Sequence, residues 1–370
     1  MAATDARRSR WGAIATAIAA LSLALPARAA DHVNGTVFYY ADSDHVRVLS
    51  PSLAGTTTVG AVTASARASV DIVSAASVDL VSAASPRGFT EQRAQGDLSA
   101  AYDLGAGRKV DALFAVSREP DFLTFTGGAG ASWDVLDRSV TLGLRYAFSH
   151  SKVGRTDDDA FSRRRMQHQA EISFSPLLSK AAVADLVYAL TVVDGYQANP
   201  YRFVRLYEPG ATGYATAVTE RVPDLRVRHA LVLRVRARLA RPLFGVGEYR
   251  AYVDGWGMLA HSAMARGIVT VGPFTFTAEA RAYRQTSASF YRRRYYTFPG
   301  APDLRTADKE LGPLWTALGG LHAEWGRRVG RVEALRVGVG GDYLHMRYLD
   351  HALLPSRDAG MLSVDLTVEF

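Results

Sequence analysis

Hydrophobic and polar residues alternate without interruption from Gly360 to Phe370. The aliphatic side chains fall on even positions, and the polar residues from Ser363 to Glu369 fall on odd positions. A strict period of two is typical of a β-strand with one apolar and one polar face. The sequence therefore predicts a terminal strand, and in a closed sheet this strand pairs with the first one.

The same alternation recurs in earlier segments of the chain. Clear examples are residues 110–117, 140–149, 231–239 and 274–282. Taken alone, such segments fit either a soluble sandwich or a membrane barrel, because in water either face could be the buried one. We favour the barrel, because an uncovered apolar strand at a sheet edge promotes aggregation in water and full closure removes the edge.

The connections between these segments alternate between short and long. Residues 135–138 form a short one, and residues 194–225 and 291–312 form long ones. Outer-membrane barrels have short periplasmic turns and longer external loops. The predicted fold class is all-β, a closed antiparallel transmembrane β-barrel of about 16–18 strands. We favour about 18, because residues 201–207 and 214–222 would add two strands inside the longest connection.

Residues 1–29 have the features of a secretory signal peptide. A basic segment around Arg8 precedes the apolar run 12–25, and residues 27–29 read Ala-Arg-Ala, which matches an A-x-A cleavage site. The predicted division is a signal peptide at residues 1–29 and an outer-membrane β-barrel at residues 30–370. The expected location is the outer membrane of a Gram-negative bacterium.

Composition narrows the class of protein further. The chain has no cysteine, which excludes disulfides and thiolate metal sites. After the signal peptide, no segment approaches the ~18 consecutive apolar residues of a spanning helix. The formal net charge of +7 is modest and lies partly in the signal peptide. Because an exported protein also rarely meets nucleic acid, we expect no nucleic-acid partner.

Arginines at a spacing of two predict a charged lumen. Arg234, Arg236 and Arg238 share one face of the segment 231–239, opposite its aliphatic residues. Luminal charge tunes the selectivity of a barrel, so this ladder would favour anions, including acidic sugars. The alternative is that such arginines pair with carboxylates of neighbouring strands and only stabilise the wall. The candidate selectivity residues are Arg234, Arg236, Arg238, Arg145, Arg281 and Glu279.

A second candidate surface lies in the loop that follows the segment 274–282. Its sequence mixes aromatic rings with guanidinium groups, in the order Tyr291, Arg292, Arg293, Arg294, Tyr295 and Tyr296. Aromatic rings stack on sugar faces, and arginine binds carboxylate or phosphate in a bidentate manner. We therefore predict contact with a sugar or with lipopolysaccharide. The alternative is an aromatic girdle at the membrane interface.

We expect no catalytic residue, no metal and no cofactor, and hence no enzyme. His150 and Ser151 are adjacent, as are His261 and Ser262. Neighbouring strand residues point to opposite faces, so neither pair can be a nucleophile and its base. No G-x-S-x-G or H-E-x-x-H motif accompanies them. The acidic run 157–159 is interpreted as part of a solvated external loop.

Residues 39–124 carry a family resemblance. They contain Val-Leu-Ser-Pro at 48–51 and an octad, V-D-[IL]-V-S-A-A-S, that stands at 70–77 and again at 78–85. We interpret the octads as part of an external or lumen-folded loop. The stretch resembles a family of bacterial outer-membrane proteins known by a domain-of-unknown-function label. The resemblance implies a barrel of about 18 strands that serves exopolysaccharide or capsule export with a periplasmic polysaccharide export protein.

The terminal strand carries a second resemblance. Leu366, Val368 and Phe370 resemble the signal by which outer-membrane barrels are recognised for assembly, which implies the barrel assembly machinery as a partner. The expected function is a channel that exports a polysaccharide substrate to the cell surface, in contact with outer-membrane lipid and lipopolysaccharide. The main alternative is a general or anion-preferring diffusion porin, with residues 194–225 as its inward loop. A structural or adhesive barrel is a further alternative, and a barrel lipid hydrolase or acyltransferase is the least favoured.

Overall fold

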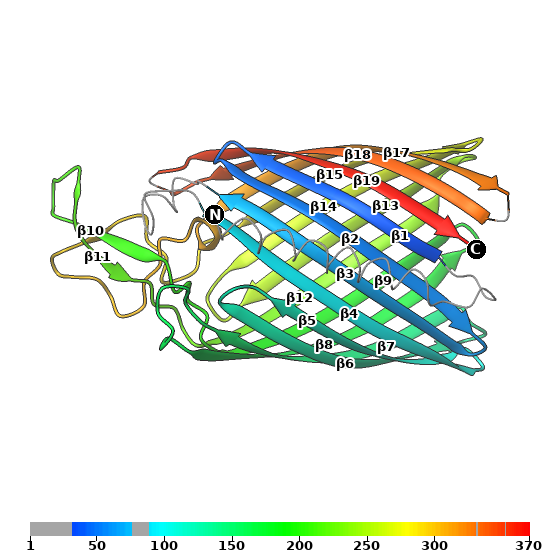
Figure 1. The fold of residues 1–370 in the computed structure, drawn as a ribbon, viewed down its shortest axis with the longest axis horizontal. Coiled ribbons are helices and arrows are strands. Elements are labelled where there is room, and N and C mark those ends of the chain that lie inside the picture. The colour runs from blue at the N-terminus through cyan, green and yellow to red at the C-terminus, as the bar shows by residue number, and fades with distance from the viewer. Residues whose placement is uncertain (1–31, 76–88, 331, 352) are drawn as a thin grey trace, which may run out of the picture.

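The computed structural model describes residues 32–75, 89–330, 332–351 and 353–370. Sixteen strands form one closed antiparallel barrel, and three further strands form a separate small sheet. The barrel lies lengthwise in Figure 1, and each of its strands is hydrogen-bonded to two neighbours. The predicted fold class, an all-β closed antiparallel barrel, is confirmed.

Long strands build the wall. With 11 to 17 residues each, they exceed the ~9–11 residues that a tilted strand uses to cross a bilayer. In chain order the barrel strands are β1 (His32–Asp42), β2 (Val46–Val59), β3 (Val62–Ala75), β4 (Phe89–Gly105), β5 (Arg108–Arg118), β6 (Phe122–Val135), β7 (Val140–Val153), β8 (Arg163–Ser179), β9 (Ala182–Gly195), β12 (Leu225–Arg238), β13 (Leu243–Asp254), β14 (Leu259–Val271), β15 (Phe274–Gln285), β17 (Leu314–Val329), β18 (Val332–Tyr348) and β19 (Ser356–Glu369). Within the described ranges the helical element is the short turn η1 (Lys309–Leu311), and no helix there is long and apolar enough to cross a bilayer.

The strands β1 and β19 close the barrel. They are paired along the whole length of β1, and side chains on their polar face are joined as well. Asn34 Nδ2 donates to Thr367 Oγ1 at 2.8 Å, and Thr36 Oγ1 donates to Asp365 Oδ1 at 2.6 Å. The predicted alternation of the terminal strand and its pairing with the first strand are therefore confirmed. Recognition of its last residues by an assembly machinery stays a prediction.

Large apolar side chains point outward at alternate positions around the barrel. Leu362 of β19 and Leu144 of β7 are 58% and 51% exposed, although both lie in the middle of regular strands. The residues between such positions face inward and are mostly small, polar or charged. This distribution is the reverse of that in a soluble protein and is typical of a barrel whose outer wall meets lipid.

The connections follow the predicted alternation of length. At one end, turns of two residues join β2 to β3, β4 to β5, β8 to β9 and β14 to β15. At the other end lie the long connections, residues 196–224 and 286–313, which gather at the left of Figure 1. We call the end with the long loops the external end, as in outer-membrane barrels generally.

The barrel has 16 strands rather than the favoured 18. The two segments expected to add strands do form β10 (Phe203–Tyr207) and β11 (Tyr214–Thr219), but these pair with each other and with β16 (Tyr295–Tyr296) outside the barrel. With five and six residues, they are shorter than the ~9–11 residues needed to cross a bilayer. Because β10 and β11 are too short to cross the bilayer, they lie outside the barrel wall.

Two sequence interpretations concern the first part of the chain. The interpretation of the first octad as a loop is wrong, because residues 70–75 lie in β3 and pair with β4, and residues 72–75 also pair with β2. An octad rich in small and apolar residues suits a strand as well as a loop, and its pairing with neighbouring strands shows that residues 70–75 form a strand. The second octad lies outside the described residues, as does the signal peptide at residues 1–29, which stays a prediction.

Candidate functional site

The inward face of the barrel is polar and open to water. The inward side chains of Arg93, Arg145 and Arg236 are 47%, 53% and 55% exposed. Side chains in a packed protein core are almost fully buried, and the buried hydrophobic clusters of the described residues lie at the external end instead. The interior is therefore a water-accessible passage rather than a packed core.

The predicted arginine ladder lies on β12 and points into this passage, but two of its members are paired. Arg234 Nη2 lies 2.6 Å from Glu248 Oε2 on β13, and Arg236 Nη2 lies 2.6 Å from Asp185 Oδ2 on β9. These ion pairs match the alternative in which arginines stabilise the wall. A role of the ladder in selectivity stays a prediction.

Two further candidates are paired more loosely. Arg145 Nη2 lies 3.4 Å from Asp111 Oδ1. The guanidinium carbon of Arg238 lies 5.5 Å from the centre of the Phe244 ring, which is a cation–π contact rather than an ion pair. The passage therefore carries positive charge that is only partly neutralised.

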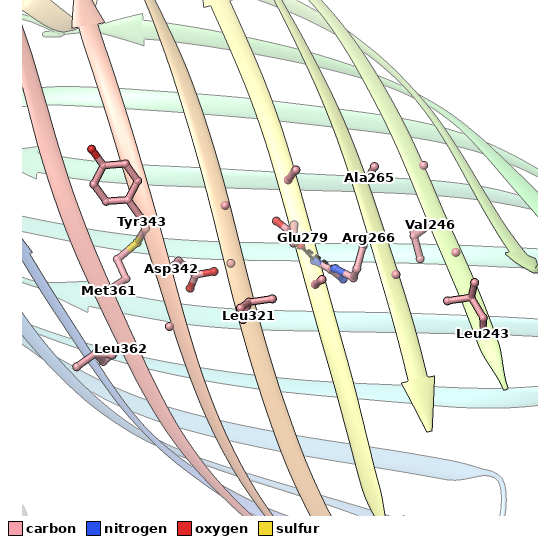
Figure 2. Close-up of a pocket in the computed structure, with 18 of the residues that line it drawn as sticks. Leu243, Val246, Ala265, Arg266, Glu279, Leu321, Asp342, Tyr343, Met361 and Leu362 are labelled. Atoms are coloured by element: carbon pink, nitrogen blue, oxygen red, sulfur yellow. Dashed lines mark hydrogen bonds and ion pairs between the residues drawn. The ribbon is translucent and has the colours of Figure 1, made fainter. Parts of the chain in front are cut away.

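Glu279 and Arg281 lie on the luminal face of β15. Glu279 forms an ion pair with Arg266 of β14, and Figure 2 shows these two side chains turned toward one another. Arg281 forms no ion pair with any residue that the structure describes. It is the least neutralised of the predicted selectivity residues, together with Arg238.

A hollow of about 1370 Å³ lies in the wall from β12 through β19 to β1, and Figure 2 draws residues that line it. Most residues that line it are small and occupy outward positions, among them Gly247, Ala265 and Gly319. Leu321 and Tyr343 line it too and are strongly exposed on the outer wall. The hollow therefore faces lipid and is separate from the water-accessible passage.

Residues 196–224 and 286–313 fold together at the external end, and we call these two loops the cap. β10 of the first loop runs parallel to β16 of the second, with Leu206 opposite Tyr295. Val204, Leu206 and Tyr295 are buried together in a small apolar core. Packing of this kind fixes the two loops relative to each other.

The cap is attached to the barrel at separate points of the rim. Three turns hold it, through Asp44 between β1 and β2, Asp121 between β5 and β6, and Trp256 between β13 and β14. These residues contact Lys309, Tyr201 and Phe290 of the cap, respectively. Because the three turns are well separated in the order of strands around the barrel, the cap extends across the external mouth.

Charged side chains join the two loops inside the cap. Arg202 of the first loop pairs with Asp308 of the second, and Thr306 Oγ1 donates to Glu220 Oε1 at 2.5 Å. Burial raises the pKa of the Glu220 carboxyl, and the Arg202 guanidinium beside it acts in the opposite direction. Polar contacts thus reinforce the apolar core, and the two loops form one unit.

The residues predicted to contact sugar or lipopolysaccharide all lie in the cap, but two of them are buried and four are exposed. Tyr291 and Tyr295 are buried, and their hydroxyls donate to the carbonyl oxygens of Asp350 and Phe290. These two rings pack the cap and are unavailable to a ligand, so we remove them from the predicted contact surface. The remaining four are exposed and stay candidates: Arg292, Arg293, Arg294 and Tyr296.

Aromatic side chains form two bands on the outer wall that sequence reasoning missed. Tyr39, Phe125 and Tyr343 lie toward the external ends of their strands, and Trp133 and Phe274 lie toward the opposite ends. All five are exposed. Aromatic girdles of this type mark the two interfaces of a membrane. Strand residues build the girdle, whereas the sequence-based alternative placed it in the 291–296 loop.

His261, one of the histidines considered as a catalytic base, has another partner. His261 points outward and hydrogen-bonds the Tyr249 hydroxyl through Nδ1 at 2.6 Å, whereas Ser262 faces the lumen. A further luminal histidine, His322, has its Nε2 atom 3.0 Å from Asp342 Oδ1. Adjacent residues on these strands do point to opposite faces, as expected, so His261 and Ser262 cannot act on one substrate atom.

A group of three carboxylates was not anticipated from the sequence. Glu91 of β4 and Glu119 and Asp121 of the β5–β6 turn have oxygens within 4.8 Å of one another. They line a cavity of about 380 Å³ beneath the cap, and burial raises the pKa of the Glu119 carboxyl. A whole hairpin separates Glu91 from Glu119 in sequence, so only the register of β4 and β5 reveals that they meet.

Solved structures with a similar fold share little sequence with this chain. OprD from Pseudomonas aeruginosa is 9% identical, with 92% of this chain and 95% of that chain covered and a TM-score of 0.44. The outer membrane protein opdK from Pseudomonas aeruginosa is 11% identical, with 94% and 100% covered and a TM-score of 0.46. OccAB3 from Acinetobacter baumannii is 8% identical, with 93% and 100% covered and a TM-score of 0.45. What this barrel does is therefore inferred from its own lumen and cap.

Sequence comparison identifies a family but no activity. No curated protein sequence matches the chain. A family model does match, over residues 27–343, and its description reads "Protein of unknown function (DUF3570)". The match takes in the barrel from β1 to most of β18. The description names no substrate and gives no link to polysaccharide export.

Proposed function

We propose that this chain, which belongs to the DUF3570 family, forms a channel through which small hydrophilic solutes cross the outer membrane. The observation that carries the proposal is a water-accessible, charged interior in a closed barrel whose outer wall is apolar. Barrels of about 16–18 strands leave an aqueous passage. Size and luminal charge then select among solutes, and no catalytic step or cofactor is required.

The outer wall supports the membrane location. Outward aliphatic side chains cover the strands, and the two aromatic bands lie where interfaces are expected. Among closed barrels, such a wall suits the outer membrane of a Gram-negative bacterium, which the predicted signal peptide would allow the chain to reach.

Export of a polysaccharide with a periplasmic export protein is the second candidate, and it rests on the resemblance of residues 39–124. The cap favours small solutes over a polymer. Because the cap is attached to three turns and extends across the mouth, a continuous chain would have to pass between the cap and the rim. We therefore place the porin-type function first.

The proposal is tested by reconstituting the purified barrel into planar lipid bilayers and proteoliposomes. We expect stepwise KCl conductance and a rate of sugar uptake that falls as the sugar becomes larger. Absence of conductance both in the complete barrel and in a variant without residues 286–313 would overturn the proposal. Surface polysaccharide in a deletion strain, measured before and after complementation, tests export separately.

Replacing Arg234, Arg236 and Arg238 together by glutamine is expected to shift the ion selectivity of the channel toward cations. The change removes three positive charges and leaves Glu248 and Asp185 without their partners, so this part of the lumen becomes more negative. The reversal potential across a KCl gradient measures the shift. An unchanged reversal potential in a folded variant would exclude a role of the ladder in selectivity.

A further inference from the structure

We propose that the external part of the lumen separates charge from one side to the other and thereby favours zwitterionic solutes. This inference rests on the proposed channel function and names its solute class. Two groups of side chains carry it. The basic wall consists of Arg228, Arg250 and Arg281, and the acidic wall consists of Glu91, Glu119 and Asp121.

The basic wall presents positive charge that no ion pair with a described residue neutralises. Its arginines point inward from β12, β13 and β15, three or four residues from the external ends of these strands. None of the three forms an ion pair with a described residue, and Arg250 and Arg281 are exposed. Arg226 and Arg234 on the same side are, in contrast, each paired with a carboxylate.

The acidic wall presents negative charge in excess. Its three carboxylates crowd together, with oxygens within 4.8 Å of one another. The cavity that they line beneath the cap has five carboxylates and two guanidinium groups in total, namely Glu91, Glu119, Asp121, Glu220, Asp308, Arg165 and Arg202. This side of the lumen therefore remains net negative.

Strand order places the two walls on opposite sides. β5, which leads into the acidic turn, and β15, which carries Arg281, have seven strands between them in either direction around the barrel. Both walls lie near the external strand ends, because Glu91 is the third residue of β4 and Arg281 is four residues from the end of β15. The charges are thus separated across the lumen rather than along it.

A separation of this kind distinguishes solutes by how their charge is arranged. An ion with one charge is attracted by one wall and repelled by the other, and a neutral solute interacts electrostatically with neither. A zwitterion orients its carboxylate toward the basic wall and its ammonium toward the acidic wall, so both interactions are favourable. Added salt weakens them, because the Debye length is only about 10 Å at 0.1 M ionic strength.

Proteoliposome swelling at low ionic strength tests the inference with γ-aminobutyrate, its neutral analogue butyramide and the anion butyrate. In the unmodified barrel, γ-aminobutyrate should enter about threefold faster than butyramide, and faster than butyrate. A variant that combines Arg250→Gln, Arg281→Gln, Glu91→Gln and Glu119→Gln should admit γ-aminobutyrate and butyramide at nearly equal rates, so that the ratio of the two entry rates is close to one. The two arginine substitutions alone, or the two glutamate substitutions alone, should lower this ratio in part. These two variants test the inference even if the fourfold variant fails to fold.

The matched control combines Arg336→Gln with Glu369→Gln. It removes one positive and one negative luminal charge that pair at 2.8 Å near the opposite end of the barrel, and the advantage of γ-aminobutyrate should persist. A barrel that conducts KCl but admits γ-aminobutyrate and butyramide equally overturns this inference and leaves the channel function intact. A barrel without KCl conductance, with or without its cap, overturns the channel function itself.

Discussion

Replacing residues 286–313 by an Asn-Gly turn is expected to raise the single-channel conductance about threefold or more, because the change opens a lumen of the width that 16-stranded barrels have. The deleted loop carries Lys309 and Phe290, which attach the cap to the turns of Asp44 and Trp256. Gln285 and the first residue of β17 are register partners, so a two-residue turn can close the shortened hairpin. Single-channel recording in planar bilayers measures the change.

Removal of the other half of the cap is the matched control. Residues 203–219 can be replaced by Gly-Gly, because the Glu220 amide donates to the Arg202 carbonyl at 3.1 Å and the two ends therefore lie together. This change deletes β10 and β11 but leaves residues 286–313 attached to the rim, so conductance should change by less than about twofold. An equal rise in both variants would place the restriction in the β10–β11 hairpin, and no rise in either would show that the cap does not restrict ion flow.

The two features proposed to govern transport act one after the other along the passage. The cap limits which solutes enter by size, and the basic and acidic walls lie directly beneath it at the external strand ends. Deleting residues 286–313 leaves the residues of both walls in place. It should therefore relax selection by size while part of the selection by charge persists.

The barrel could be predicted because the membrane imposes its pattern on every strand. A strand that faces lipid on one side and water on the other must alternate, and the segment 360–370 does so without exception. Turn lengths added an independent signal, because a closed antiparallel barrel places all odd connections at one end. The number of barrel strands was harder to predict, because the sequences of β10 and β11 have the pattern of strands but are too short to cross a bilayer.

The site was less predictable, because it depends on register and loop packing. Spacing alone placed Arg234 and Arg236 in the lumen, but their partners Glu248 and Asp185 come from strands on either side. Tyr295 lies in a loop rich in arginine and aromatic residues, which gives no sign that its ring is buried against Leu206 of another loop. Local patterns specify which face a residue takes, and long-range pairing specifies what it meets there.

Asp254→Ala is expected to lower the free energy of unfolding by about 3–5 kcal/mol, because it leaves a buried guanidinium without its counter-ion. The Asp254 side chain is fully buried, and its Oδ2 lies 2.5 Å from Arg226 Nη2. The same carboxylate accepts hydrogen bonds from the backbone amides of Trp256 and Met258, each at 3.0 Å. Urea unfolding in detergent micelles, followed by tryptophan fluorescence, measures the loss.

Glu248→Gln provides the comparison, since it breaks the half-exposed pair with Arg234 and should cost no more than about 1 kcal/mol. The Arg226 guanidinium also lies 4.0 Å from the centre of the Trp256 ring, and that ring packs against Phe290 of the cap. Asp254→Ala should therefore loosen the cap and raise conductance as stability falls. A stability loss without higher conductance would mean that Trp256 holds the cap independently of Asp254. A loss as small as that of Glu248→Gln would mean that Arg226 finds another partner or reaches water.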